Sequence, residues 1–363
     1  MSDPLNILFS TFSFIGFVAV LIPSYWHLKA ANVATCLYIF WAALGCLNMF
    51  INARIWDGNI RNTAPIWCDI STRVIIAENV AMPASILCIT RQLYKVTGLA
   101  KGDLINKRRE GFIDLAIGLG LPILQMPLSY IVQGHRFDII EDIGCWPATY
   151  DTAAACALVL GWPLALGLVS ASFGLCALHR FIMHSRELRS LMSSDKTHRS
   201  QTFRLIVLAT SDITITIPLS VFFIYFDGLH AEPWISWQYV HSDFSAIGFF
   251  PAAQWKSDKM TQIAFQSTQW STVLCALIFF ILFGTFSEEA SEHYRLAYRF
   301  ARSRFGCLLP CLLIRRPAKH STPAIPITAN INTPQSQLRV SFIGAAHGEM
   351  LGSLDVLEKA TGS

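Results

Sequence analysis

The sequence predicts an all-α membrane protein built as a bundle of seven transmembrane helices. The mean hydropathy is +0.44, 53% of the residues are hydrophobic and only 14% are charged, whereas soluble domains carry about 25% charged residues. Seven apolar stretches are also long enough to cross the hydrocarbon core, which needs roughly 20 helical residues. We therefore expect one helical domain in residues 1–284 and a cytoplasmic tail in residues 285–363.

Each apolar stretch predicts one helix. In chain order the expected helices cover residues 5–26, 33–56, 67–95, 112–133, 153–178, 204–226 and 263–284. Pro83 and Pro218 fall inside the third and the sixth of them, where a proline removes a backbone hydrogen bond and permits a kink. Such a kink is either a static bend or a hinge. The sixth helix is the candidate moving part, with Pro218 as its hinge.

The basic residues between these helices fall mainly on one side of the bundle. The loops after the second, fourth and sixth helices hold four of them, namely Arg61, Arg136, Lys256 and Lys259. The loops on the other side hold ten: Lys29, Lys101, Lys107, Arg108, Arg109, Arg180, Arg186, Arg189, Lys196 and Arg199. Basic residues accumulate on the cytoplasmic side of membrane proteins. We therefore expect a multi-pass protein with its N-terminus outside and its C-terminus in the cytoplasm.

The sequence lacks the residues that several activities of membrane proteins require. Retinal-based pumps need a lysine in the last helix, and residues 263–284 contain none. The histidines fall in loops or at helix ends, which argues against a metal hydrolase. We expect no metal, no cofactor and no enzymatic activity. The basic residues form no stripe with interleaved aromatic residues, which argues against nucleic acid as a partner. A receptor layout remains, and a seven-helix small-solute transporter or channel is the alternative, although no repeated halves are found.

Local sequence gives a more specific interpretation. The segments TCLYIFWAALGCLNMFIN (35–52), APIWCDISTRVIIAENVAMPASILCITRQLYK (64–95), RLIVLATSDITITIPLS (204–220) and SEEASEHYRLAYR (287–299) resemble fungal mating pheromone receptors of the a-factor type, especially those of basidiomycetes. The resemblance extends from about residue 20 to residue 300. It implies a G-protein-coupled receptor in the plasma membrane whose ligand is a farnesylated pheromone peptide and whose partner is a heterotrimeric G protein of the mating response. Homodimerisation is left open.

Two cysteines lie on the expected outer side. Cys68 begins the third helix, and Cys145 lies in the loop between the fourth and fifth helices. Both face an oxidising compartment, in which a disulfide persists. One interpretation is a disulfide that holds this loop over the mouth of the bundle, and the other is a pair of free thiols. A disulfide requires Cα atoms about 4.4 to 6.8 Å apart.

Three ionisable residues inside the expected helices are candidates for function. At a rise of 1.5 Å per residue, Glu78 lies about 15 Å into the third helix and Asp212 about 12 Å from the cytoplasmic start of the sixth. We expect both to face the bundle interior as ligand-pocket or switch residues. The alternative is a carboxyl group that only stabilises helix packing through a hydrogen bond. Arg73 is either a ligand contact or the partner of Asp69 in a structural i,i+4 pair.

The outer loop of residues 227–262 is rich in aromatic residues. Trp234, Trp237 and Tyr239 are candidate ligand contacts, because a prenyl group needs apolar surface worth about 0.8 kcal/mol per buried CH₂ group. The alternative is a belt of aromatic residues at the lipid headgroups. Glu141 and Asp142, close to Cys145, are candidate contacts for amino groups of a peptide.

The expected cytoplasmic face has two basic loops and a basic tail. The resemblance implies that these loops face the G protein through Lys107, Arg108, Arg109, Arg180, Arg186, Arg189 and Arg199, although the positive-inside bias alone also accounts for them. We expect the tail to stay basic to about residue 316 and then to become disordered. Cys307 and Cys311 lie beside its basic residues and are candidates for palmitoylation.

Overall fold

The computed structural model describes residues 3–98, 106–183, 196–229 and 231–285, together with Ser291, Tyr294, Arg295 and Arg299. The chain divides into two compact units, Met1–Leu308 and Leu309–Ser363, and all described residues belong to the first. Seven helical spans in the described part are long and apolar enough to cross a membrane. The predicted seven-helix bundle is therefore confirmed, and Cys307, Cys311 and the expected disordered tail lie outside the described residues.

The first three spans are α1 with α2, α3 and α4. Helix α1 (Pro4–Leu21) continues as α2 (Ser24–Lys29) after a break at Pro23, because proline has no N–H to donate within the helix. Helix α3 (Val33–Ile55) follows. Helix α4 (Pro65–Gly98) has 34 residues and is about 51 Å long, which exceeds the roughly 30 Å core of a bilayer. It runs unbroken through Pro83.

The other four spans contain π-helical turns or an internal proline. The fourth span consists of α5 (Lys107–Leu115), η1 (Ala116–Gly120) and α6 (Leu121–Ile131). The fifth consists of α7 (Ala153–Ala155), η2 (Cys156–Leu160) and α8 (Gly161–Met183). The sixth is α10 (Lys196–Leu229), and the seventh consists of α13 (Lys259–Phe279) and η3 (Phe280–Thr285). Most spans are longer than the apolar stretches because the helices continue into turns that contain polar and charged residues. Helix α10 passes Pro218 without interruption.

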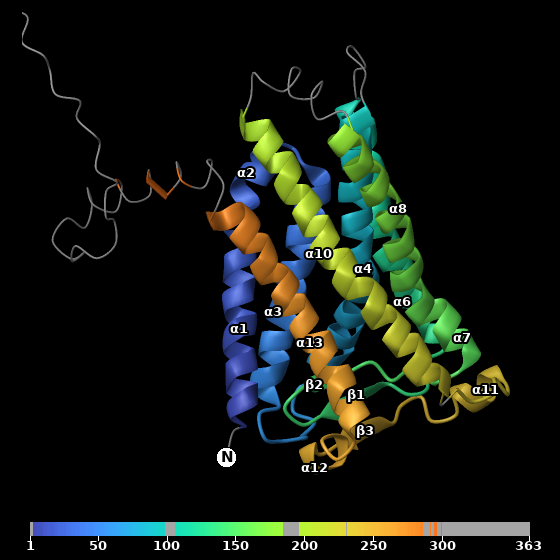
Figure 1. Cartoon of the computed structure of the whole chain (residues 1–363). Helices are drawn as coiled ribbons and strands as arrows, with labels where there is room; N and C mark the ends of the chain where they lie inside the picture. Colours follow the sequence, from blue (N-terminus) through green and yellow to red (C-terminus); the bar gives the residue numbers. More distant parts are fainter. Residues whose placement is uncertain are drawn as a thin grey trace, which may run out of the picture. The chain divides into compact units, whose positions relative to one another are not determined.

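One end of the bundle carries a small β-sheet that hydropathy did not predict. Strand β1 (Phe137–Ile140) pairs antiparallel with β2 (Gly144–Trp146) and parallel with β3 (Ile247–Phe250). The short helices α11 (Trp237–Val240) and α12 (Ala252–Trp255) flank β3 in sequence. Figure 1 shows the strands and the N-terminus at the same end. We call this the sheet end, and the other the opposite end.

Helix α4 lies at the centre of the bundle and contacts α3, α6, α8 and α10. The main apolar core runs along the bundle and includes the fully buried Tyr38, Ile86, Leu208 and Phe279. A second apolar cluster lies under the sheet and joins Trp56, Phe137 and Ile139 to Cys68 and Cys145. The sheet is therefore packed onto the ends of α3 and α4.

Gly144 allows this close packing, and its replacement tests it. Its φ is +100°, and an added Cβ would lie 2.5 Å from the Cβ of Asn52. We expect Gly144→Ala to lower the free energy of unfolding by about 2 kcal/mol through backbone strain and overlap. Gly58 also has a positive φ, of +63°, but has nothing within 4 Å of its added Cβ. Gly58→Ala is the control, and equal thermal shifts in both variants would contradict the packing argument.

Candidate functional site

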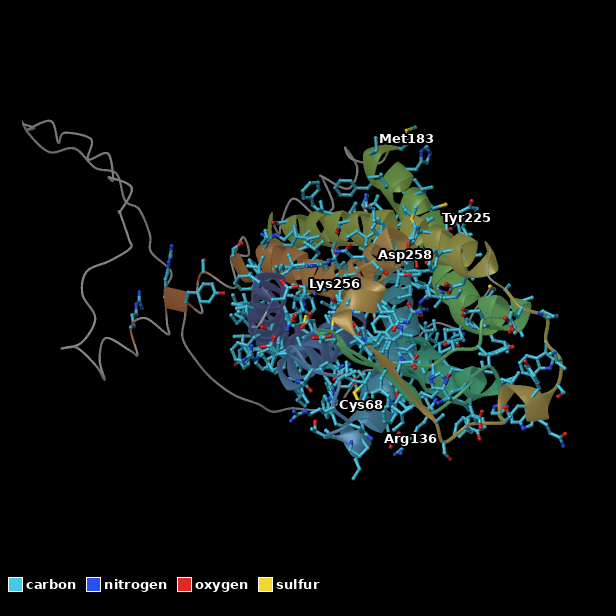
Figure 2. All side chains as sticks on the ribbon, turned by 90° about the horizontal axis from the view of Figure 1, so that it is seen from below. Cys68, Arg136, Met183, Tyr225, Lys256 and Asp258 are labelled. Carbon is cyan, nitrogen blue, oxygen red and sulfur yellow. A yellow bond between two sulfur atoms is a disulfide. The ribbon has the colours of Figure 1, made fainter. Side chains whose placement is uncertain are left out.

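A disulfide fixes the sheet to the start of α4. Cys68 and Cys145 are bonded to each other, with their Cα atoms 5.2 Å apart, and both are fully buried. Figure 2 looks onto the sheet end and labels Cys68 there. The bond closes a separation of 77 residues, so the segment between α6 and α7 is held across this end of the bundle.

A cavity of about 400 Å³ lies beneath that segment. Its walls come from α3, α4, η2, α8, α10 and α13, and residues between Asp138 and Thr152 contribute to its lining at the sheet end. Glu78, Asp212 and Pro83 line it, as do Asn79, Asp138, Asp151 and Asp227. The two deep carboxyl groups predicted from sequence thus share one cavity.

Glu78 and Asp212 contact the same face of α13. The Oγ1 of Thr272 donates to Oε1 of Glu78 at 2.9 Å, and the Sγ of Cys275 lies 3.5 Å from Oδ1 of Asp212. Thr216 donates to the other Asp212 oxygen at 3.2 Å. Thr272 and Cys275 are three residues apart, so their Cβ atoms are roughly 5 to 6 Å apart. Two carboxyl groups from α4 and α10 therefore meet at adjacent positions of a third helix.

Glu78 fits into the bundle because α3 has a glycine beside it. Glu78 is 5% exposed, and a Cβ at Gly45 would overlap its carboxyl group. Toward the opposite end, Leu208 lies one turn beyond Asp212, and Phe279 lies one turn beyond Cys275. Both are fully buried in the apolar core. Toward the opposite end, the wall of the cavity on α10 and α13 therefore ends at Asp212 and Cys275.

Arg73 lies in a different cavity, of about 390 Å³, with Asp69, Thr72, Gln133 and Arg136. Arg73 donates to the side-chain oxygen of Gln133 at 2.7 Å. Arg136 donates two hydrogen bonds to Asp69, at 2.9 and 2.5 Å. The described residues show no ion pair between Asp69 and Arg73, because the loop after α6 brings Arg136 to Asp69 instead. The alternative interpretation, in which Arg73 contacts the ligand, stays a prediction. Figure 2 shows Arg136 at this end.

The two acidic candidates beside Cys145 hold loops together. Glu141 accepts a hydrogen bond from the backbone N–H of Ala252 at 2.6 Å. Asp142 accepts from Lys256 at 2.8 Å, and Lys256 also donates to Asp3 at 2.7 Å. Partial burial lowers the pKa of Lys256, but the hydrogen bonds to Asp142 and Asp3 outweigh it and leave that pKa raised. Neither acid lines either cavity, so ligand contact by Glu141 and Asp142 stays a prediction.

The aromatic candidates lie around α11 rather than along either cavity. Trp237 stacks on His241 with ring centroids 4.0 Å apart, and Tyr239 meets Tyr150 edge to face at 6.3 Å. Trp234 is 37% exposed. This arrangement presents aromatic surface outside the bundle, and a role in ligand entry stays a prediction for all three.

Asp138 and Asp151 line the main cavity but were not identified from sequence. Both lie within seven residues of Cys145 in the chain, on the segment that the disulfide holds across the bundle. A firm assignment of the Cys68–Cys145 disulfide would have indicated Asp138 and Asp151, because the disulfide places this segment over the sheet end of the bundle. Asp138 also accepts a hydrogen bond from His135 at 2.5 Å.

The His135–Asp138 pair predicts a pH dependence of stability. The hydrogen bond to Asp138 raises the pKa of His135 above 6.5, although partial burial opposes it. A histidine whose pKa is higher in the folded than in the unfolded chain stabilises the fold at pH values below its unfolded-state pKa. This contribution is lost as the pH rises through the folded-state pKa. We expect the wild type to melt above His135→Gln at pH 5.5, with a difference that shrinks as pH passes upward from about 6.5. A difference independent of pH would contradict the pairing.

Three basic candidates are exposed at the opposite end, and Arg180 is half-buried there. Lys107, Arg108 and Arg109 begin α5. Arg180 lies over the ring of Tyr94 at 4.0 Å from its centroid and donates to the phenol oxygen at 2.8 Å. Arg186 and Arg189 lie outside the described residues, as does the side chain of Arg199, whose backbone belongs to α10.

A charged network at the same end was also not identified. Arg91 of α4 pairs with Asp114 at 2.6 Å and with Glu110 at 2.9 Å. Gln92 donates to Asp114 at 2.5 Å, and Lys95 pairs with Glu110 at 2.6 Å. The sequence signal is a pair of i,i+4 repeats, basic at 91 and 95 and acidic at 110 and 114. This network ties α4 to α5.

Comparisons with known proteins assign the chain to a family. The family model described as STE3, pheromone A receptor, matches residues 8–306. The chain belongs to the pheromone A receptor family. The predicted resemblance to a-factor-type and basidiomycete receptors is confirmed. This is a receptor family and not an enzyme family.

Individual relatives agree with this pheromone A receptor assignment. The "Pheromone B alpha 3 receptor" of Schizophyllum commune is 38% identical over 311 residues, which are 84% of this chain and 50% of that protein. "Pheromone receptor 1" of Mycosarcoma maydis is 30% identical over 317 residues, 84% of this chain and 85% of that protein. The chain spans about half the length of the first of these relatives.

The fold is that of a known seven-helix receptor. The crystal structure of squid rhodopsin is similar with a TM-score of 0.56 at 13% identity, covering 86% of this chain and 90% of that one. Together with the seven spans and the family match, this makes the chain a multi-pass plasma-membrane protein.

Proposed function

We propose that this pheromone A receptor family member is a G-protein-coupled receptor for a farnesylated mating pheromone peptide. The peptide binds at the sheet end, and the receptor activates a heterotrimeric G protein at the opposite end. The proposed function involves no enzymatic step. The observation that carries the proposal is the cavity beneath the disulfide-anchored sheet, whose wall on α10 and α13 gives way to the apolar core toward the opposite end. A pocket of this form takes a ligand from one side and does not conduct it to the other.

The proposed orientation places the sheet end outside the cell. The Cys68–Cys145 disulfide lies at the sheet end, because Cys145 belongs to β2, and disulfides persist in the extracellular compartment. The basic residues Lys107, Arg108, Arg109 and Arg180 lie at the opposite end, and cations accumulate on the cytoplasmic side. Both criteria support an outside N-terminus.

Apolar side chains support a lipid-bearing ligand. Val159, Leu160, Leu219, Phe223 and Phe226 line the main cavity along η2 and α10. Each CH₂ group of a farnesyl chain that is buried against them contributes about 0.8 kcal/mol. The exposed aromatic residues around α11, including Trp237 and Tyr239, offer further apolar surface for a lipid chain on its way to the cavity.

We propose that basic residues at the opposite end face the G protein, namely Lys107, Arg108, Arg109 and Arg180. Arg186, Arg189 and Arg199 are proposed to do the same, and Pro218 is the proposed hinge about which α10 moves. Residues 1–284 form the receptor domain, residues 285–363 form the tail, and Cys307 and Cys311 are its palmitoylation sites. A homodimer is compatible with this arrangement.

The transporter alternative gains no support. One cavity lined jointly by Arg73, Glu78 and Asp212 would have favoured a solute path. Arg73 lies in the second cavity instead, and the fully buried Leu208 and Phe279 lie beyond the deep acids.

The test is nucleotide exchange on a fungal heterotrimeric G protein in membranes that contain this chain. A panel of synthetic peptides is added, each in a farnesylated and an unprenylated form. We expect at least one farnesylated peptide to stimulate exchange while its unprenylated partner does not. Failure of the whole panel with folded protein would overturn the proposal, and solute flux would be measured next.

A further inference from the structure

Five carboxyl groups line the main cavity, from Glu78, Asp138, Asp151, Asp212 and Asp227, and no lysine, arginine or histidine lies among the described residues of its wall. His135 pairs with Asp138 from outside this wall, and Asp151 and Asp227 have interactions of their own, so the inference rests on Glu78 and Asp212. We propose that this cavity binds a cationic group of the ligand, a primary ammonium or a guanidinium, between Glu78 and Asp212. That the cation belongs to a pheromone peptide rests on the proposed function, whereas binding of the cation itself does not.

The two deep acids are buried without a cationic partner among the described residues. Glu78 is 5% exposed and Asp212 is 2% exposed. Within the described part of the chain, neither forms an ion pair. Their hydrogen bonds come from neutral hydroxyl and thiol groups of Thr272, Thr216 and Cys275. A buried carboxylate without a cation is costly, so a positively charged ligand group has the most to gain there.

Glu78 and Asp212 converge on one face of α13. Glu78 and Asp212 project from different helices onto Thr272 and Cys275, which are neighbours on one face of α13. Side chains three residues apart are separated by roughly 5 to 6 Å at their Cβ atoms. A single ammonium has three N–H donors and a guanidinium has five. One cation held between the two carboxyl groups would therefore join α4, α10 and α13.

A polar side chain beside these acids supplies an independent observation. Asn79 lies in the middle of α4, is exposed, and lines the same cavity. Its amide has no hydrogen-bond partner among the residues that the structure describes. Its oxygen can therefore accept a further N–H of the cation. The ligand would thus place its charge at the acids and its lipid against the apolar wall.

The test uses a matched pair of small probes on the purified full chain. Benzylammonium chloride and benzyl alcohol have the same ring and differ in charge. At about 10 mM probe and a dissociation constant of about 1 mM, ligand binding raises the melting temperature of a protein of this size by about 3 °C. We expect this rise with benzylammonium, relative to sodium chloride at equal ionic strength, and not with benzyl alcohol.

Variants locate the site. Glu78→Gln and Asp212→Asn keep the side-chain shape and should each abolish the shift with benzylammonium. Asp243→Asn removes an exposed acid from the loop before β3, outside this cavity, and should keep the shift. Because the probe comparison in the wild type needs no mutation, a folding defect in a variant does not decide the outcome. Equal shifts with both probes, or a benzylammonium shift that survives in folded forms of both cavity variants, would overturn the inference.

A second measurement separates this inference from the proposed function. Any farnesylated peptide that stimulates exchange is remade with its arginines as citrulline, its lysines as norleucine and its amino terminus acetylated. We expect the half-maximal concentration to rise at least 30-fold in the wild type and much less in Asp212→Asn. An unchanged response to the neutral peptide would overturn the cation site and leave the farnesylated-peptide receptor standing.

Discussion

Replacing Cys68 with serine is expected to lower the free energy of unfolding by about 2 to 5 kcal/mol and to abolish the response to ligand. The disulfide closes a 77-residue separation and so restricts the unfolded chain. Its loss also frees β2 from α4, which opens the segment carrying Asp138 and Asp151. Thermal unfolding of purified protein measures the first effect, and nucleotide exchange measures the second.

Cys176 provides the matched control for this substitution. It is a free, exposed cysteine on α8, so Cys176→Ser should stay within about 0.5 kcal/mol of the wild type. Mild reduction of the wild type should reproduce the Cys68→Ser result and leave Cys68→Ser itself unchanged. Equal stability of Cys68→Ser and Cys176→Ser would contradict the anchoring role of the disulfide.

Replacing Asp114 with alanine is expected to cost about 3 to 5 kcal/mol of stability, because it leaves a largely buried guanidinium without its main partner. The Asp114 side chain is fully buried, and that of Arg91 is only 12% exposed. Gln92 loses its acceptor at the same time. The contact between α4 and α5 should loosen, and thermal unfolding reports it.

Lys95 belongs to the same network but is 36% exposed. Lys95→Ala should therefore cost at most about 1 kcal/mol, as exposed ion pairs do. A similar loss of stability in both variants would show that burial does not set the energy of this network.

Hydropathy was sufficient for the number and order of the helices, because each apolar stretch must span the bilayer. It could not predict the sheet, because three- and four-residue strands carry too little alternation to distinguish them from loops. Ion pairs between segments that are distant in the sequence could not be predicted either. Arg136 reaches Asp69 only because the chain after α6 turns back over α4, and helical spacing alone favoured Arg73 as the partner.

Depth along a helix was a good guide to the candidate site. Glu78 and Asp212 stood out as carboxyl groups far from helix ends, and both line the main cavity. Composition was a poorer guide, since Trp234 and Trp237 lie in an aromatic loop but line neither cavity. Asp138 could not be identified from sequence, because its position in the cavity wall depends on the disulfide and the sheet register together.

The central claim is that a farnesylated peptide activates this receptor by occupying the main cavity. Thr268 lines that cavity on α13, and Val221 is an exposed residue of α10 that does not line it. Exchange stimulated by an active farnesylated peptide is measured in Thr268→Trp and Val221→Trp, with both variants shown to be folded by thermal unfolding. We predict that filling the cavity abolishes stimulation and that the Val221 substitution preserves it. Full stimulation in Thr268→Trp would contradict the claim.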